Sequence, residues 1–230
     1  MKMSMFLILL LSSIFLNSCS KSSDTVTPPP TVTIPNVIIC NQGWMTKNLD
    51  VATYRNGDII SQVTDSTQWA NLTTGAWCYY NNDPSNEGVY GKLYNGFAVH
   101  DPRGLAPLGW HIPTDEEWNT LSNCLGGDSI AGGKMKTTNL WNAPDLVAPP
   151  YNGGTNSSQF AGLPGGIRTG MSAKGVFNGL GVSGWFWSSS KPTNGTDNGV
   201  PRWIYFNNDH LYRLEIQDIS YGYSIRCVKD

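Results

Sequence analysis

The sequence predicts one α+β domain made of short antiparallel strands, one or two helices and long ordered loops. One stretch carries strong helical signals, whereas several short runs rich in Trp, Tyr, Ile and Phe are separated by Asn, Asp and Gly clusters. Aromatic residues make up 11% of the chain, and disordered chains are usually poor in them. The composition therefore favours a folded, loop-rich globule.

The clearest helical signal is TDEEWNTLSNCLGG, which begins at Thr114. Thr114 and Glu117 have the spacing of a capping box, in which each side chain bonds the other residue's backbone N–H. Trp118 and Leu121 fall on one helical face, and the Gly-Gly pair predicts the end of the helix. A second, shorter helix is expected within residues 65–75, DSTQWANLTTG.

Three runs near the C-terminus, RWIYF, LYRLEI and YGYSIRCV, are broken by NNDH and QDIS. They predict an antiparallel meander. Because side chains alternate across a strand, Trp203 and Tyr205 should share one face, and so should Trp185 and Trp187 in GWFWSSS. A hairpin is also expected in VIICNQGWMTKNLDV, with its turn near Asn41.

The first eighteen residues have the pattern of a signal peptide, with Lys2 followed by an apolar run over residues 5–16. This run is shorter than the ~20 residues that a membrane-spanning helix needs. Leu16-Asn17-Ser18-Cys19 resembles the lipobox of bacterial lipoproteins, in which the cysteine receives a diacylglyceryl group and becomes the first residue after cleavage. The alternative is an ordinary secretory signal.

Residues 19–36 are rich in Ser, Thr and Pro and include three consecutive prolines. Such a segment favours an extended conformation and predicts a stalk. We therefore expect a leader at 1–18, a stalk at 19–36 and a folded domain at 37–230. Lipid on Cys19 would anchor this domain to the cell envelope, at the outer membrane of a Gram-negative bacterium.

Charge argues against several classes of partner. The leader holds one of the 15 basic residues and none of the 17 acidic ones, so the net charge without it is −3. There is no run of Lys or Arg, which makes nucleic acid and anionic lipid headgroups poor partners. The membrane is therefore expected to be reached through the lipid anchor only.

Four cysteines remain once Cys19 is assigned to lipid. Outside the cytoplasm they allow two disulfides in three possible pairings, and reduced, buried thiols are the alternative. Cys78–Cys227 is the first expectation, because both residues lie on predicted strands close to the aromatic core. Cys40–Cys124 would then be the second pair.

Several phrases together resemble one family: GWMTKNLDVATYRNGDII, YGKLYNGFAV, LAPLGWHIPTDEEWNTL, FAGLPGGIRTG, GWFWSSS and YGYSIRCVKD. They are similar to the Fibrobacter succinogenes major paralogous domain of secreted, surface and lipid-anchored bacterial proteins. The resemblance implies a C-type-lectin-like fold, in the branch shared with formylglycine-generating enzymes, and a surface module often regarded as adhesive. The family often has cysteine where Ala106 stands, which puts a family disulfide to Cys227 in doubt.

No catalytic constellation is apparent. His111 lies on a predicted strand and is expected to pack, whereas His100 and His210 lie near turns and are expected to be solvated. The formylglycine-generating relatives use two neighbouring cysteines, but only Cys227 lies in the last hundred residues. We expect no enzyme activity, no cofactor and no metal site. The NNDPSNEG loop offers oxygen ligands for calcium, although turn formation explains it better.

The expected function is therefore extracellular binding or adhesion, with a glycan as the ligand. The alternative is a structural domain that binds another envelope protein and has no small ligand. A glycan site needs an aromatic face with polar groups at its rim, and the WIYFNNDHLYR hairpin provides this combination. The alternative for these residues is that the aromatics are core and the polar cluster only forms a turn. The expected binding residues are Arg168, Trp187, Trp203, Tyr205, Asn207, Asn208 and Asp209.

Overall fold

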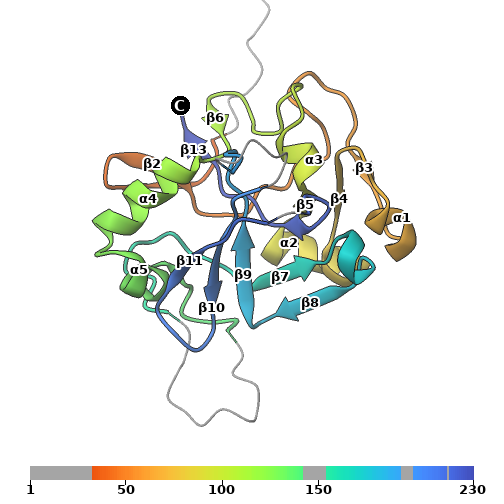
Figure 1. Cartoon of the computed structure of the whole chain (residues 1–230). Helices are drawn as coiled ribbons and strands as arrows, with labels where there is room; N and C mark the ends of the chain where they lie inside the picture. Colours follow the sequence, from red (N-terminus) through yellow and green to blue (C-terminus); the bar gives the residue numbers. More distant parts are fainter. Residues whose placement is uncertain (1–32, 142–153, 193–198, 217) are drawn as a thin grey trace, which may run out of the picture. The chain divides into compact units, whose positions relative to one another are not determined.

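The computed structural model describes residues 33–141, 154–192, 199–216 and 218–230. Ile34–Asp230 form one unit with its own core, and this unit has the α+β organisation that the sequence predicts, with mostly short strands and few helices (Figure 1). Across these described ranges, none of the helices has the length and apolar character needed to cross a bilayer.

A four-stranded antiparallel sheet joins the two ends of the unit. Its order is β1 (Asn36–Ile39), β2 (Gln42–Met45), β13 (Val228–Lys229) and β6 (Trp110–His111). The hairpin expected near Asn41 is the β1–β2 hairpin, whose turn contains Cys40 and Asn41 at φ 52° and 69°. The first hairpin and the last strand therefore lie side by side.

The second sheet is larger and mixed. Its order is β11 (Leu211–Arg213), β10 (Arg202–Tyr205), β9 (Ser183–Phe186), β7 (Gly165–Arg168), β12 (Gly222–Tyr223), β5 (Leu93–Asn95), β4 (Ala76–Cys78) and β3 (Ser61–Gln62), with β8 (Phe177–Leu180) also paired to β7. The β7–β9 and β3–β4 pairs are parallel.

The predicted C-terminal meander is confirmed only for its first two strands. β10 and β11 form the expected hairpin, but the third run divides between the two sheets. β12 inserts between β7 and β5, and β13 joins the small sheet. The physical reason is that backbone N–H and C=O groups must find hydrogen-bonding partners. Strands β5 and β7 supply them to β12, and strands β2 and β6 supply them to β13.

The predicted helix is α4 (Asp115–Cys124), and its capping box is present. The Glu117 backbone N–H donates to Thr114 Oγ1 at 3.1 Å, and the Thr114 N–H donates to Glu117 Oε2 at 2.8 Å. The second predicted helix is α1 (Ser66–Ala70), which Asp65 caps. Three further helices were not expected. They are α2 (Glu87–Tyr90), α3 (Gly96–Val99) and α5 (Asp128–Met135), and the short 3₁₀ turns are η1 (Tyr80–Asn82), η2 (Pro84–Asn86) and η3 (Met171–Ala173).

Strands β9–β11 have two different faces. On one face, Phe186, Ile204 and Leu211 are buried in a cluster with Trp118 of α4 and Met135 of α5. On the opposite face, the alternating side chains are mainly aromatic and half-buried. The helices therefore cover one side of these strands, and the aromatic side carries the candidate site.

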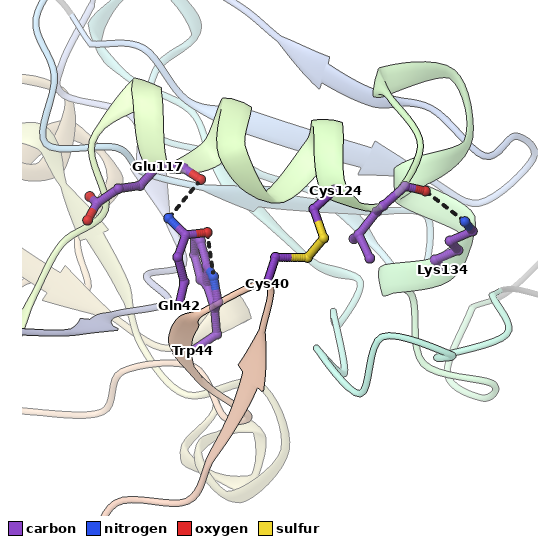
Figure 2. The surroundings of a disulfide bond; sticks show 7 residues. Cys40, Gln42, Trp44, Glu117, Cys124 and Lys134 are labelled. Carbon is purple, nitrogen blue, oxygen red and sulfur yellow. Dashed lines mark hydrogen bonds between the residues drawn. A yellow bond between two sulfur atoms is a disulfide. The ribbon is translucent and has the colours of Figure 1, made fainter.

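A disulfide links Cys40, in the β1–β2 turn, to Cys124 at the end of α4 (Figure 2). Their Cα atoms are 6.2 Å apart, within the range usual for disulfides. Beside it, Gln42 Nε2 donates to the Glu117 carbonyl at 3.3 Å and Trp44 Nε1 donates to Gln42 Oε1 at 3.3 Å. The second of the two expected pairings thus fastens the first hairpin to the predicted helix.

The first expected pairing is wrong, because Cys78 and Cys227 are separate, buried thiols. Trp77 faces the cluster that contains Cys227, and alternation along β4 turns Cys78 to the other side, towards a cluster with Trp69. Burial raises the pKa of both thiols to about 12. Both cysteines are therefore neutral core residues.

Candidate functional site

Aromatic rings form a stack across the uncovered face of the large sheet. Trp185, Trp203 and Tyr212 occupy facing positions on β9, β10 and β11. The ring centroids of Trp185 and Trp203 are 5.0 Å apart, those of Trp203 and Tyr212 are 4.1 Å apart, and the interplanar angles are 8° and 16°. Tyr223 stacks on Trp185 at one end and His210 stacks on Tyr212 at the other. We call these residues the aromatic stack.

The parallel arrangement decides which part of each ring a ligand can reach. The faces of Trp185, Trp203 and Tyr212 lie against one another, so their edges point away from the sheet. All three are half-buried, and Trp185 Nε1 already donates to Ser183 Oγ at 3.1 Å. The stack therefore presents a rigid apolar ridge, and its Tyr223 end has no open ring face because Tyr223 is buried between Trp185 and Trp187.

A groove of about 710 Å³ lies beside the Tyr223 end of the aromatic stack and is lined in part by Trp185 and Tyr223. Its walls include two exposed apolar side chains, Met171 at 66% and Leu214 at 42% of their full accessible surface. This surface is unusual, because large apolar side chains seldom gather around a hollow without a role. The groove is lined by Ile167, Met171, Ser172, Trp185, Leu214, Ile216, Asp218, Tyr221 and Tyr223.

The polar groups of the groove are held in place by one another. Asp218 Oδ1 accepts a hydrogen bond from the Ser220 backbone N–H at 2.9 Å and another from the Ser220 hydroxyl, and Asp218 Oδ2 accepts from the Ser172 N–H at 3.4 Å. The hydroxyls of Ser172 and Tyr221 are 3.5 Å apart. These contacts fix the carboxylate and two hydroxyls at one end of a mainly apolar groove.

None of the seven sequence-predicted binding residues lines this groove, although two of them lie on the same face of the sheet. Trp203 and Tyr205 point to the aromatic face and are half-buried, and Asn207 is exposed in the β10–β11 turn. Asn208 and Asp209 instead lie against α5. Its Gly133 N–H donates to the Asp209 carbonyl at 3.1 Å and its C-terminal neighbour Lys136 donates to the Asn208 carbonyl at 2.8 Å.

Two predicted binding residues are structural. Trp187 is fully buried, with Nε1 donating to the Tyr94 carbonyl at 2.7 Å, and its ring packs under Gly199. Arg168 is also fully buried, and its guanidinium donates to the carbonyls of Val63 at 2.6 Å and Thr64 at 2.8 Å. Neither residue can contact a ligand at the surface, because both are buried and their N–H groups donate hydrogen bonds to backbone carbonyls of neighbouring segments.

The sequence analysis assigned none of the groove-lining residues to a binding site. Alternation in LYRLEI already placed Tyr212 and Leu214 on one face, so that part of the signal was available. The contribution of Tyr221, Tyr223 and Met171 depends on β12 lying beside β7, which local sequence does not reveal.

The histidines do not gather into a site, and His111 is held by two carboxylates. His111 is half-buried between Glu117 and Asp230, each 2.8 Å from a ring nitrogen. Burial alone would lower the pKa of His111, but these two carboxylates outweigh it and raise the pKa above its usual value. His210 is exposed as expected, whereas His100 is half-buried.

Polar side chains of the NNDPSNEG loop form hydrogen bonds within the loop and to a neighbouring segment. Asn82 Nδ2 donates to the Thr64 carbonyl at 2.9 Å, and Asp83 Oδ1 accepts from the Ser85 N–H at 2.9 Å. In the described parts of the chain, His, Cys, Asp and Glu side chains form no group of three or more that is arranged to hold a metal ion.

Comparison with known proteins gives one match. The family model described as the Fibrobacter succinogenes major domain matches residues 37–229, which is most of the chain. No curated protein and no solved structure matches.

Proposed function

The chain belongs to the Fibrobacter succinogenes major domain family, and we propose that this member is a non-catalytic binding protein of the bacterial cell envelope whose ligand is an extracellular glycan. The observation that carries the proposal is the groove beside the aromatic stack, on the face of β9–β11 that the helices leave uncovered. Ligand sites are typically concave and mainly apolar, with a few fixed polar groups.

A sugar chain suits this combination. The C–H face of a sugar ring packs on apolar and aromatic side chains, and its hydroxyls need hydrogen-bonding partners at the edge. Trp185 and Tyr221, which are half-buried, supply aromatic surface, and Asp218, Ser172 and the Tyr221 hydroxyl supply oxygens at one end. The polar groups bond to one another and to the backbone, which supports binding without chemistry.

The proposed location rests on the N-terminal sequence, which lies outside the described residues. We propose that Cys19 carries lipid and that the Ser/Thr/Pro-rich stalk holds the domain away from the outer membrane. One acyl chain binds a membrane only marginally and two hold it stably, so a diacylglyceryl group would be a sufficient anchor.

The test is a glycan array probed with the Ile34–Asp230 unit, which contains every buried cluster described above. Met171→Ala removes an exposed groove wall at little structural cost and should weaken binding at least ten-fold. Leu108→Ala is the matched control, because Leu108 is 85% exposed and lies outside the groove. Absence of dose-dependent glycan binding by the unsubstituted unit would refute the proposal.

A second candidate function is docking of another envelope protein. It is favoured by the exposure of Met171 and Leu214, since Met in particular is common at protein-binding surfaces. Stable co-purification of an envelope protein with the unsubstituted chain, lost in Met171→Ala and kept in Leu108→Ala, would favour this function over glycan binding.

We also propose that the fold is a variant of the C-type-lectin-like fold. The arrangement that supports it is the pairing of the first hairpin with the last strand, together with α4 directly after β6 (Figure 1). An experimental structure with a different strand order in these two sheets would contradict the assignment.

A further inference from the structure

The charge of the groove is one-sided. Among its lining residues, Asp218 carries the only charge at neutral pH, and no lining residue is basic. Burial holds the pKa of the Tyr223 phenol well above its usual range, so this ring stays neutral. A ligand that enters the groove therefore meets one negative charge set in an apolar surface.

The basic residues next to the groove in sequence are directed elsewhere. Arg168 follows Ile167 on β7, and alternation turns it towards the carbonyls of Val63 and Thr64 on the opposite side. Arg213 precedes Leu214 and is paired with Asp115 and Glu215.

Lys174 is the remaining basic residue near the groove walls in sequence. It lines a separate hollow on the other side of Met171, together with Ser66 and Asn71. Among the described residues that line the groove, no basic side chain therefore balances Asp218.

Aromatic residues add to this preference. A positively charged group is attracted to the electron-rich faces of Trp and Tyr rings, and the attraction grows when the group is partly removed from water. Tyr221, which is half-buried, lines the same groove as Asp218. The faces of Trp185 are covered by Trp203 and Tyr223, and Tyr223 is buried, so Tyr221 is the ring that a cation can approach. The carboxylate and this ring favour the same kind of ligand and disfavour an anion.

We infer that the groove selects an extended glycan that bears free amino groups and rejects acidic glycans. This inference rests on the proposed glycan-binding function and names the class of sugar. The apolar wall packs against the sugar ring, and the ammonium group lies at the Asp218 end. From Trp185, which lines the groove, the row of rings continues beyond it to Trp203 and Tyr212 on β10 and β11, along which an extended chain can lie.

The experiment compares three β-1,4-linked hexasaccharides that share a backbone and differ in charge: glucosamine, glucose and glucuronic acid. Each is titrated calorimetrically into the Ile34–Asp230 unit at pH 6, where the amine is protonated. The glucosamine chain should bind at least ten-fold tighter than the glucose chain, a difference of ~1.4 kcal/mol. The glucuronic acid chain should bind more weakly than both, and added salt should reduce the differences.

Asp218→Asn keeps the shape of the side chain and an acceptor oxygen while removing the charge. It should abolish the ten-fold preference for the glucosamine chain over the glucose chain. Glu116→Gln is the matched control for net charge, because Glu116 is exposed on α4, beyond the opposite face of the sheet. It should leave the preference intact.

The outcomes separate the inference from the function on which it rests. Equal binding of the glucose and glucosamine chains, tighter binding of the glucuronic acid chain, or an unchanged preference in Asp218→Asn would overturn the inference and leave glycan binding standing. If none of the three chains binds, glycan binding at the groove fails and the inference fails with it.

Discussion

Removal of the Cys40–Cys124 disulfide should destabilise the domain by an amount that the chain topology sets. The two residues are 84 positions apart, so the cross-link greatly restricts the unfolded chain. The chain-entropy relation gives about 4.5 kcal/mol for a loop of this length, and measured values for disulfides are commonly 2–4 kcal/mol. We therefore expect a loss of about 2–4 kcal/mol in the free energy of unfolding.

Little of this loss should come from packing. Cys124 is exposed and Cys40 is half-buried, so serine at both positions leaves no large cavity. Cys40 has φ 52°, which serine tolerates no worse than cysteine. The double variant Cys40→Ser/Cys124→Ser therefore isolates the effect of the cross-link on the unfolded chain.

The assay is urea unfolding of the Ile34–Asp230 unit, followed by tryptophan fluorescence. The double variant should have a lower midpoint and a steeper dependence on urea, because its unfolded state exposes more surface. Thermal unfolding should shift down by roughly 5–15 °C for a domain of this size. A reducing agent should lower the stability of the unsubstituted protein to that of the variant and leave the variant unchanged.

The reasoning would be refuted by a loss below about 1 kcal/mol. The described cysteines form no second disulfide. The reasoning would therefore also be refuted if the double variant lost about 2–4 kcal/mol and a reducing agent then lowered its stability further.

Three further predictions concern the anchor, the α5 interface and pH. Cys19→Ala should release the chain from membranes or leave it unprocessed, and a processed variant that still fractionates with membranes would contradict lipidation. Gly132→Ala should lower the free energy of unfolding by about 1–3 kcal/mol, because a Cβ there would collide with the His210 carbonyl. Gly88→Ala is the control, because a Cβ at Gly88 has open space and should be neutral or slightly stabilising. Equal effects of the two substitutions would refute the packing of α5 against the β10–β11 turn. The raised pKa of His111 means that its pairing stabilises the domain fully below its ordinary pKa of ~6.5 and that this stabilisation is lost as pH rises through the folded value. The stability advantage over His111→Asn should therefore shrink between pH 6 and pH 8, and a constant advantage would contradict the assignment.

Local sequence predicted the elements that local interactions build. The α4 capping box needs only Thr114 and Glu117 three residues apart, and both hydrogen bonds are present. The β1–β2 and β10–β11 hairpins likewise follow from strand-forming residues on either side of turns that contain Asn.

Longer-range pairing was beyond local signals. Residues 221–228 read as one strand, but the chain places Tyr223 between β5 and β7 and Val228 between β2 and β6. The expected Cys78–Cys227 pairing was wrong for the same reason, whereas Cys40–Cys124 is present. Alternation alone shows that Trp77 and Cys78 face opposite sides, but only the sheet order shows which side holds Cys227.

The contrast between Trp187 and Trp203 shows what decides a binding surface in this fold. Both follow alternating aromatic patterns next to Gly- or Asn-rich segments, and sequence assigned both to the ligand site. The backbone at Gly199 packs directly on the Trp187 ring, and Tyr94 accepts its indole N–H, so this ring belongs to the core. Trp203 instead lies between Trp185 and Tyr212 and stays half-buried. The exposure of an aromatic side chain on these strands is thus set by whether another segment crosses above it, which the pattern within the strand does not encode. The search for ligand sites in such sheets should therefore begin with the faces that no helix or crossing segment covers.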